Sequence, residues 1–136
     1  MTVLFVCVHN AGRSQAAEAL FRHHALAAGL SVRSESAGTL GGGSLNPAVV
    51  RMLEARGVST AELTPKQLTE EMVARADRII SMGCGVDAEA CPAKFWLTED
   101  WGLDDPKGRP DDEVAAILDQ VEARVHDLIS RIQTPG

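Results

Sequence analysis

VLFVCVHNAGRSQAAEAL, residues 3–20, decides the fold class. Four apolar residues, Val3 to Val6, run into Cys7, which is typical of a parallel strand that is buried on both faces. The polar loop VHNAGRS follows, and the residues QAAEALFRHH favour a helix behind it. In α/β sheets the ligand lies beyond the carboxyl ends of the strands. We therefore predict a ligand site at Cys7.

Strand and helix patterns alternate along the rest of the chain. We expect strands at residues 2–7, 30–36 and 76–82 with a further short strand at 94–98, a loop at 37–45, and helices at 14–28, 47–56, 68–75 and 114–132. Asn46 and Pro47 supply an N-cap and a first helical residue, and Gly57 supplies a C-cap. This alternation predicts an α/β fold: a single three-layer domain over residues 1–136, with a four-stranded parallel sheet and helices on both faces.

The composition limits the classes of function. The 136 residues are 45% hydrophobic and 24% charged, as in a soluble globular domain. No apolar run approaches the roughly 20 residues that span a bilayer, and no secretory signal is evident, so we expect a cytoplasmic protein without a membrane partner. The net charge of −6 argues against nucleic acid as a partner. Three cysteines, an odd number, favour catalytic, redox or metal roles over a disulfide framework.

The loop after Cys7 has the features of an oxyanion site. Its backbone N–H groups and the helix N-terminus behind it form a cradle for a tetrahedral anion. Arg13 is expected to bind two oxygens of that anion, and the same field stabilises the Cys7 thiolate as a nucleophile. Ser14 is expected to cap the helix and to donate to the thiolate, while Asn10 and Gly12 tolerate the positive φ of a tight loop. The predicted oxyanion-binding residues are Val8, His9, Asn10, Ala11, Gly12 and Arg13.

The stretch CVHNAGRS, residues 7–14, resembles the C-x2-N-x2-R-S phosphate loop of the low-molecular-weight protein tyrosine phosphatase family. The resemblance continues in SESAG at 34–38, LNPAVVRML at 45–53 and DWGLDDPKG at 100–108. It implies the fold of that family, with Cys7 as the nucleophile and Asp105, which precedes a proline, as the general acid. A loop turn is the alternative for this Asp-Pro pair, and the neighbouring Asp104 is expected to be solvated.

Within that fold the chain is more similar to arsenate reductases of the thioredoxin-coupled type. Cys84 and Cys91 follow the third predicted strand with C-x6-C spacing. The resemblance implies a relay in which Cys7 binds arsenate covalently, Cys84 attacks Cys7 and releases arsenite, and Cys91 then attacks Cys84. Such a reaction needs no cofactor but an external thiol reductant. We expect thioredoxin, or alternatively mycothiol or glutathione with a glutaredoxin-like protein.

Other functions stay open at this point. A protein tyrosine phosphatase or a phosphatase of small phosphoesters would use the same loop, although the chain has no Tyr and lacks the aromatic residues after the acid with which tyrosine phosphatases of this family hold the aryl ring. A redox sensor or arsenical-binding protein would need only the cysteine pair, and would leave Arg13 and Asp105 unexplained. The structural alternatives are Cys7 buried near a surface arginine, and Cys84 and Cys91 as inert buried thiols.

No bound metal is expected. One C-x6-C pair without a second pair is a poor zinc site, and the histidines are scattered along the sequence at His9, His23, His24 and His126. Some reductases of this type hold a potassium ion beside the loop. The resemblance matches three of the ligand positions to Asn10, Glu18 and Ser36. At the fourth position the chain has Lys66, whose ammonium is expected to take the place of the ion.

Overall fold

The computed structural model describes residues 1–7, 10, 12–39, 44–61, 63–82, 99–103 and 106–133. The elements in these residues are β1 (Thr2–Cys7), α1 (Arg13–Ala27), β2 (Arg33–Gly38), α2 (Pro47–Ala55), α3 (Glu70–Arg75), β3 (Arg78–Ser81), β4 (Glu99–Asp100) and α4 (Asp111–Gln133). The strands form one parallel sheet in the order β2-β1-β3-β4. The predicted α/β class and the four-stranded parallel sheet are confirmed.

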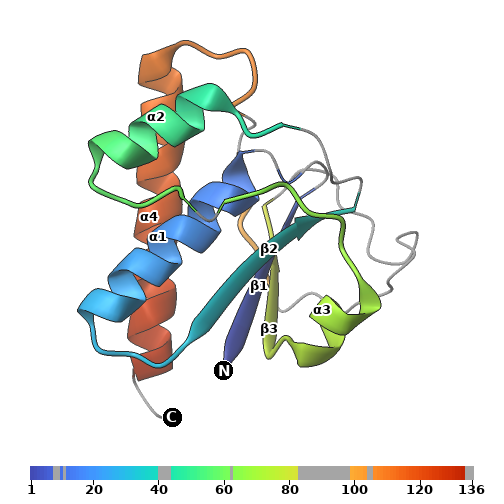
Figure 1. Ribbon diagram of the computed structural model, residues 1–136. Coiled ribbons are helices and arrows are strands. Elements are labelled where there is room, and N and C mark those ends of the chain that lie inside the picture. Colours follow the sequence, from blue (N-terminus) through green and yellow to red (C-terminus); the bar gives the residue numbers. More distant parts are fainter. Residues whose placement is uncertain are drawn as a thin grey trace.

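The strand β1 lies inside the sheet and is buried on both faces (Figure 1). On one face Phe5 packs against Phe21 of α1 and against Trp101, with ring centroids 5.9 and 5.4 Å apart. Leu4 and Val6 alternate with Phe5 and belong to a second apolar cluster, on the face covered by α3. Burial of each side chain of this size contributes roughly 1.5–3 kcal/mol. Figure 1 shows α1, α2 and α4 on the first face and α3 on the other, so the three predicted layers are present.

The predicted start of α2 is confirmed, whereas the helix ends one residue earlier than predicted, with Arg56 rather than Gly57 as its C-cap. Asn46 Oδ1 accepts hydrogen bonds from the N–H groups of Ala48 (3.0 Å) and Val49 (3.3 Å), and Pro47 begins the helix. Gly57 follows α2 with a φ of 77°, the left-handed conformation in which helices commonly end. The buried side of α4 consists of Val114, Ile117, Leu118, Val121, Val125, Leu128 and Ile129.

The second strand differs from its predicted position. It covers Arg33–Gly38 rather than 30–36, so the first two residues of the predicted loop at 37–45 belong to the strand. The reason is the register with β1, in which Cys7 lies opposite Gly38. Pairing along the whole of β1 therefore extends β2 to the edge of the sheet where the Cys7 loop begins.

The third strand and the third helix are shorter than predicted. The strand β3 spans Arg78–Ser81 rather than 76–82. The helix α3 begins at Glu70, two residues later than predicted, because the Thr69 side chain accepts the Met72 N–H (3.2 Å) and caps the helix there.

The fourth described strand, β4, lies just after the region where a fourth strand was expected. The predicted strand at 94–98 lies outside the described residues, and β4 follows directly after it. In β4, Glu99 and Asp100 pair with Ile80 and Ser81 of β3. No helix among the described residues combines the length and the apolar character that crossing a membrane requires. The assignment of residues 1–136 to a single domain stays a prediction.

Candidate active site

Cys7 is the last residue of β1, and only 4% of it is exposed. Its sulfur accepts a hydrogen bond from the Asn10 backbone N–H (3.0 Å) and lies 2.8 Å from Ser14 Oγ. Asn10 has a φ of 56°, a left-handed conformation that Asn tolerates better than most residues, and this turns the chain back toward the sulfur. The positive φ predicted for Asn10 is confirmed. Hydrogen bonds donated to the sulfur stabilise the thiolate relative to the thiol.

The side chain of Asn10 orients Ser14 toward that sulfur. The backbone N–H of Lys66 can only donate, so the Asn10 atom that it contacts at 2.8 Å is Oδ1. Asn10 Nδ2 therefore faces Ser14 Oγ at 2.8 Å and donates to it. When Cys7 is a thiolate it can only accept, so the Ser14 hydroxyl is then the donor in the 2.8 Å contact with Cys7 Sγ. The contact predicted between Ser14 and Cys7 is present.

Two further predictions for this loop are wrong. Ser14 does not cap α1: the N-cap is Gly12, without a side-chain hydrogen bond, and Ser14 lies inside the first turn with its hydroxyl engaged by Cys7 and Asn10. Gly12 does not adopt a positive φ either, since its φ is −133°. Its lack of a side chain serves close packing instead, because a Cβ at Gly12 would lie only 3.0 Å from Pro106 Cγ.

Arg13 joins the loop to two other segments of the chain. Its Nη1 donates to the carbonyl oxygen of Leu103 (2.7 Å) and, less closely, to that of Met82 (3.5 Å). Met82 follows β3 and Leu103 follows β4, while Arg13 itself begins α1 after the loop that follows β1. The guanidinium thus links the carboxyl ends of three parallel strands, which is the edge where ligands bind in sheets of this kind. The contact of Arg13 with an oxyanion stays a prediction.

A buried carboxylate, Glu18 of α1, lies behind the loop with 3% of the residue exposed. Ser36 Oγ of β2 donates to Glu18 Oε1 (2.6 Å), and Lys66 Nζ lies 3.6 Å from the same oxygen. Arg22 pairs with the other oxygen, Oε2. Such partners are required because a buried charge has lost its hydration. The Lys66 ammonium lies beside Glu18, as the sequence predicts, and the expected absence of a bound ion stays a prediction.

Gln15 is a residue of the site that the sequence analysis missed. It is fully buried, and its Nε2 lies within hydrogen-bonding distance of Thr64 O (2.8 Å) and of Asn10 Oδ1 (2.9 Å) and O (3.1 Å). It therefore ties the loop to the segment before α3. The available signal was its spacing from Glu18, because residues three apart share a face of a helix and a second polar side chain on a buried face indicates a polar network.

Six of the predicted site residues lie outside the described residues, namely Val8, His9, Ala11, Cys84, Cys91 and Asp105. Their roles stay predictions. The described members are Cys7, Asn10, Gly12, Arg13 and Ser14, and the structure brings them together between the end of β1 and the first turn of α1. This is the position that the strand-loop-helix pattern indicates.

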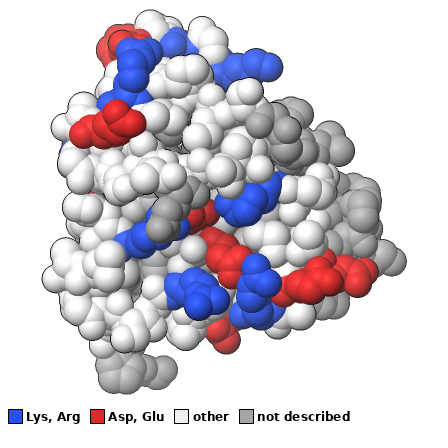
Figure 2. Space-filling model, viewed as in Figure 1, with Lys and Arg blue, Asp and Glu red and all other residues white. Residues whose placement is uncertain are grey.

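Charged side chains of both signs share the face of the molecule shown in Figure 2. Near β2 and α3, Arg75 donates to both carboxylate oxygens of Glu35, at 2.6 and 2.5 Å. The hydrogen bond from Arg75 lowers the pKa of Glu35 against the opposing effect of burial. This pair joins α3 to β2 across the sheet.

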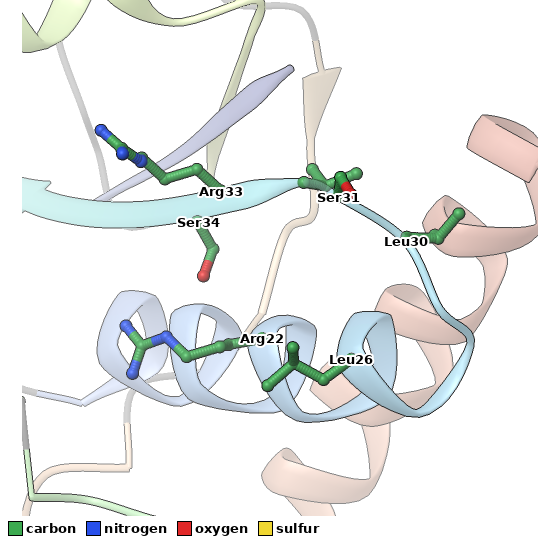
Figure 3. A pocket seen from close by; sticks show the side chains of 7 residues that line it. Arg22, Leu26, Leu30, Ser31, Arg33 and Ser34 are labelled. Atoms are coloured by element: carbon green, nitrogen blue, oxygen red, sulfur yellow. The ribbon is translucent and has the colours of Figure 1, made fainter.

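An open hollow lies between the C-terminal part of α1 and the start of β2 (Figure 3). Its volume is about 510 Å³, and it is lined by Arg22, Leu26, Leu30, Ser31, Val32, Arg33 and Ser34. Arg33 begins β2, whereas Cys7 lies opposite Gly38 at the other end of that strand. The hollow is therefore at the opposite edge of the sheet from the Cys7 loop and forms no part of the candidate active site.

The comparison with protein families agrees with this architecture. Residues 2–135 match the family model of the low molecular weight phosphotyrosine protein phosphatases. The chain belongs to this family. The fold that the phosphate-loop resemblance implied is therefore the fold that the chain has.

Curated relatives cover nearly the whole chain. A protein of Halobacterium salinarum described as a putative arsenate reductase is 34% identical in an alignment of 129 positions that covers 91% of this chain and 87% of the relative. A protein of Synechocystis described as a glutaredoxin arsenate reductase is 33% identical, over 96% of this chain and 97% of the relative.

Solved structures of an arsenate reductase and of a phosphotyrosine phosphatase both resemble the chain. The thioredoxin-dependent arsenate reductase of Corynebacterium glutamicum is 39% identical with a TM-score of 0.76, over 97% of this chain and 61% of the other. The low molecular weight phosphotyrosine phosphatase of Vibrio cholerae is 25% identical with a TM-score of 0.84, over 100% and 99%.

Proposed function

We propose that the protein is an arsenate reductase that binds arsenate covalently at Cys7 and reduces it through a relay of three thiols. The observation that carries the proposal is the Cys7 sulfur at the end of β1, contacted by the Asn10 N–H and the Ser14 hydroxyl at the start of α1. Polar hydrogens directed at the sulfur favour the thiolate, and a helix N-terminus favours an anion beside it. Two relatives that bear the name arsenate reductase, at 34% and 33% identity, direct the choice of anion to arsenate.

Each step of the proposed reaction is a thiolate attack. The Cys7 thiolate forms a bond to arsenic, and one arsenate oxygen leaves as water after taking a proton from Asp105. Cys84 then attacks the Cys7 sulfur, so that a disulfide forms while the electron pair of the S–As bond stays on arsenic, which is reduced from As(V) to As(III) and leaves as arsenite. Cys91 attacks Cys84 and frees Cys7. The resulting Cys84–Cys91 disulfide takes two electrons from an external thiol reductant.

The contact between Arg13 and Met82 supports the role of the second thiol. Arg13 Nη1 lies 3.5 Å from the carbonyl oxygen of Met82, which is described, and Cys84 follows Met82 by two residues. Two residues of extended chain span at most about 7 Å. Met82, the last described residue before the segment that carries Cys84, therefore contacts Arg13 beside the Cys7 loop.

The packing of Gly12 supports the role of the acid. Pro106 lies so close to Gly12 that a Cβ there would be 3.0 Å from Pro106 Cγ, and Asp105 is the residue before this proline. On the other side of Asp105, the Leu103 carbonyl accepts the 2.7 Å hydrogen bond from Arg13. Residues on both sides of the proposed acid thus contact the loop in which arsenate would bind.

Thioredoxin is the proposed reductant. The Corynebacterium glutamicum enzyme, which is 39% identical to this chain, is described as thioredoxin-dependent. The Synechocystis relative is described as a glutaredoxin arsenate reductase, so glutathione or mycothiol with a glutaredoxin-like protein is the alternative. Cys91 distinguishes the two routes. A dithiol reductant such as thioredoxin reduces a protein disulfide, which Cys91 helps to form, whereas a small thiol with its partner protein can act at an earlier step of the reaction.

Arsenate-dependent oxidation of NADPH, coupled through thioredoxin and its reductase, tests the proposal. The wild-type protein should turn over, whereas Cys7→Ser, Cys84→Ser and Cys91→Ser should not. In a single turnover, Cys91→Ser should still release one equivalent of arsenite and accumulate a Cys7–Cys84 disulfide that peptide mass spectrometry detects. Full thioredoxin-coupled turnover by Cys91→Ser would contradict the relay and favour the small-thiol route. Activity of the Cys7→Ser variant would contradict the proposal that Cys7 is the nucleophile, and with it the proposed enzyme.

Two adjacent aspartates provide a matched control for the acid. Asp105→Asn should lower kcat by roughly 10²–10⁴-fold, the contribution typical of a general acid, and Asp104→Asn should leave most of the activity. Both variants remove one negative charge from the same segment, so a charge effect alone would lower their rates equally. Equal losses would therefore exclude Asp105 as the specific proton donor.

A phosphatase is the second candidate, favoured by the family and by the likeness to the Vibrio cholerae phosphotyrosine phosphatase. Hydrolysis of p-nitrophenyl phosphate would require Cys7 and Asp105 but neither Cys84 nor Cys91. We expect at most weak hydrolysis beside arsenate reduction. If the wild-type protein hydrolyses the ester efficiently and reduces no arsenate, and Cys84→Ser behaves like the wild type, the phosphatase replaces the reductase.

A further inference from the structure

We propose that His24, Glu122 and His126 form a binding site for a divalent transition-metal ion of the zinc class. His24 Nε2 lies 2.7 Å from Glu122 Oε2, and one ligand atom from each of the three residues lies within 4.8 Å of the others. The centroids of the His24 and His126 rings are 4.2 Å apart. The fold therefore brings together two histidines that the sequence analysis regarded as scattered.

The site is built by the packing of two helices. Glu122 and His126 are four residues apart on α4, so their side chains share one face of that helix. The helix α1 packs along α4 (Figure 1), and this places His24, in the last turn of α1, beside them. The side chains of His24 and Glu122 are 21% and 27% exposed, and His126 is exposed, so an ion can enter from solvent.

The donor atoms suit the proposed class of ion. Two imidazole nitrogens and one carboxylate oxygen are preferred ligands of Zn²⁺, Ni²⁺ and Cu²⁺, whereas Mg²⁺ and Ca²⁺ require mostly oxygen. Zinc with three protein ligands takes water as its fourth ligand. Bonds of about 2.0–2.2 Å in a tetrahedron place ligand atoms about 3.4 Å apart, so small rotations of partly exposed side chains complete the site. The His24 proton shared with Glu122 moves to the other ring nitrogen or to solvent, and no electron is transferred.

The neighbouring charges permit a cation at this position. Arg56 Nη1 donates to Glu122 Oε1 (2.9 Å), which leaves Oε2 directed at His24, and Arg56 Nη2 donates to Asp119 Oδ1 (2.8 Å). Asp119 thus balances the guanidinium, and Glu122 supplies a further negative charge. Burial raises the pKa of Glu122, but the hydrogen bonds and charges of His24 and Arg56 outweigh it and lower that pKa below 4.5.

The proposed site is remote from Cys7. Arg13 and His24 are separated by eleven positions of α1, about 16 Å at 1.5 Å per residue. An ion at His24 would hold the C-terminal end of α1 to α4 and would not take part in chemistry at Cys7. The proposal is therefore independent of the arsenate reductase assignment.

Zn²⁺ titration of the full chain, followed by NMR of the histidine imidazole groups, tests the site residue by residue. One equivalent of Zn²⁺ should shift the His24 and His126 signals and leave the His23 signal nearly unchanged. Imidazole signals of His24 and His126 that do not move with excess Zn²⁺ would overturn the proposal. This measurement needs no variant, so it decides the matter even if a substituted protein fails to fold.

Calorimetric titration of protein whose thiols are alkylated with iodoacetamide gives the affinity without competition from the cysteines. His24→Gln and His126→Gln should each weaken Zn²⁺ binding by more than about tenfold, since losing a ligand costs at least as much as losing a supporting partner. His23→Gln is the matched control, because the His23 ring packs edge-on against His24 with centroids 5.0 Å apart but is not part of the donor set. Equal losses in all three variants would show histidine binding without a defined site and overturn the proposal.

Discussion

Asn10→Ala and Asn10→Gly separate two contributions of one residue to the active-site loop, its hydrogen bonds and its backbone conformation. Asn10 is fully buried and has a φ of 56°. Its side chain donates to Ser14 Oγ and accepts from Gln15 Nε2 and from the Lys66 backbone N–H, at 2.8, 2.9 and 2.8 Å. Both variants lose these bonds, but only alanine must adopt the left-handed conformation with a Cβ.

The expected magnitudes follow from these contacts. The Lys66 N–H loses its partner in both variants, and one unsatisfied buried donor costs about 1–3 kcal/mol. Gln15 Nε2 keeps its bond to Thr64 O, so losing the Asn10 side chain costs less free energy at Gln15 than at the Lys66 N–H. The left-handed backbone conformation costs alanine about 1–2 kcal/mol more than glycine, which favours the glycine variant. The greater entropy of glycine in the unfolded chain opposes this by about 0.5–1 kcal/mol. We expect Asn10→Ala to lose roughly 3–4 kcal/mol and Asn10→Gly about 1 kcal/mol less.

Urea unfolding of the three proteins, monitored by circular dichroism under reducing conditions, measures these differences. The order of stability should be wild type, then Asn10→Gly, then Asn10→Ala, with unchanged m-values. Equal stability of the two variants would refute the argument from φ. A loss below about 0.5 kcal/mol in both variants, the size of an ordinary surface substitution, would refute the argument from buried hydrogen bonds.

Two shorter predictions concern other described contacts. Ser14→Ala removes the hydroxyl 2.8 Å from Cys7 Sγ. In a background without other thiols, the pH profile of the rate of Cys7 alkylation by iodoacetate should therefore shift by about one to two pH units to higher pH. An unchanged profile would contradict the proposed donation. The hydrogen bond from Arg75 lowers the pKa of Glu35 below 4.5, so its stabilisation is complete above that value and is lost as the pH falls through the lowered pKa. Urea unfolding should therefore show Glu35→Gln less stable than wild type at pH 7, with a gap that closes below pH 4.5; a gap that persists in acid would contradict the pairing.

The parts of the fold that depend on local sequence were predictable. The apolar run of β1 and the helix formers of α1 act within a few residues, and Asn46 caps α2 through its own next two N–H groups. The end of β2 was not predictable in this way. Gly38 has the local character of a loop residue, and only its pairing opposite Cys7 of β1 makes it part of a strand. Pairing between strands is a long-range interaction that overrides local preference.

The same distinction explains the outcome at the active site. Cys7 and Ser14 are close in sequence, and the contact between them follows from the strand-loop-helix pattern. The role of Gly12 was misjudged because its neighbour Pro106 is distant in sequence. Either close packing or a positive φ can require a glycine, and the local sequence does not distinguish the two. Gln15 was missed for a similar reason, since one of its partners, Thr64 O, reaches it only in the folded chain.

Lys66 makes two separate contacts beside the loop, one through its backbone N–H and one through its side-chain ammonium. Its backbone N–H holds Asn10 Oδ1, which any residue except proline can do at that position. Its side-chain ammonium lies 3.6 Å from Glu18 Oε1, which only a cationic side chain or a bound cation can replace. The conformation of the loop at Asn10 is therefore independent of the side chain at position 66, while the charge balance of the buried Glu18 depends on it. A change of the cation beside this carboxylate should therefore leave the Cys7 sulfur presented in the same way, because Asn10, which orients Ser14, is held by the Lys66 backbone N–H and not by the ammonium.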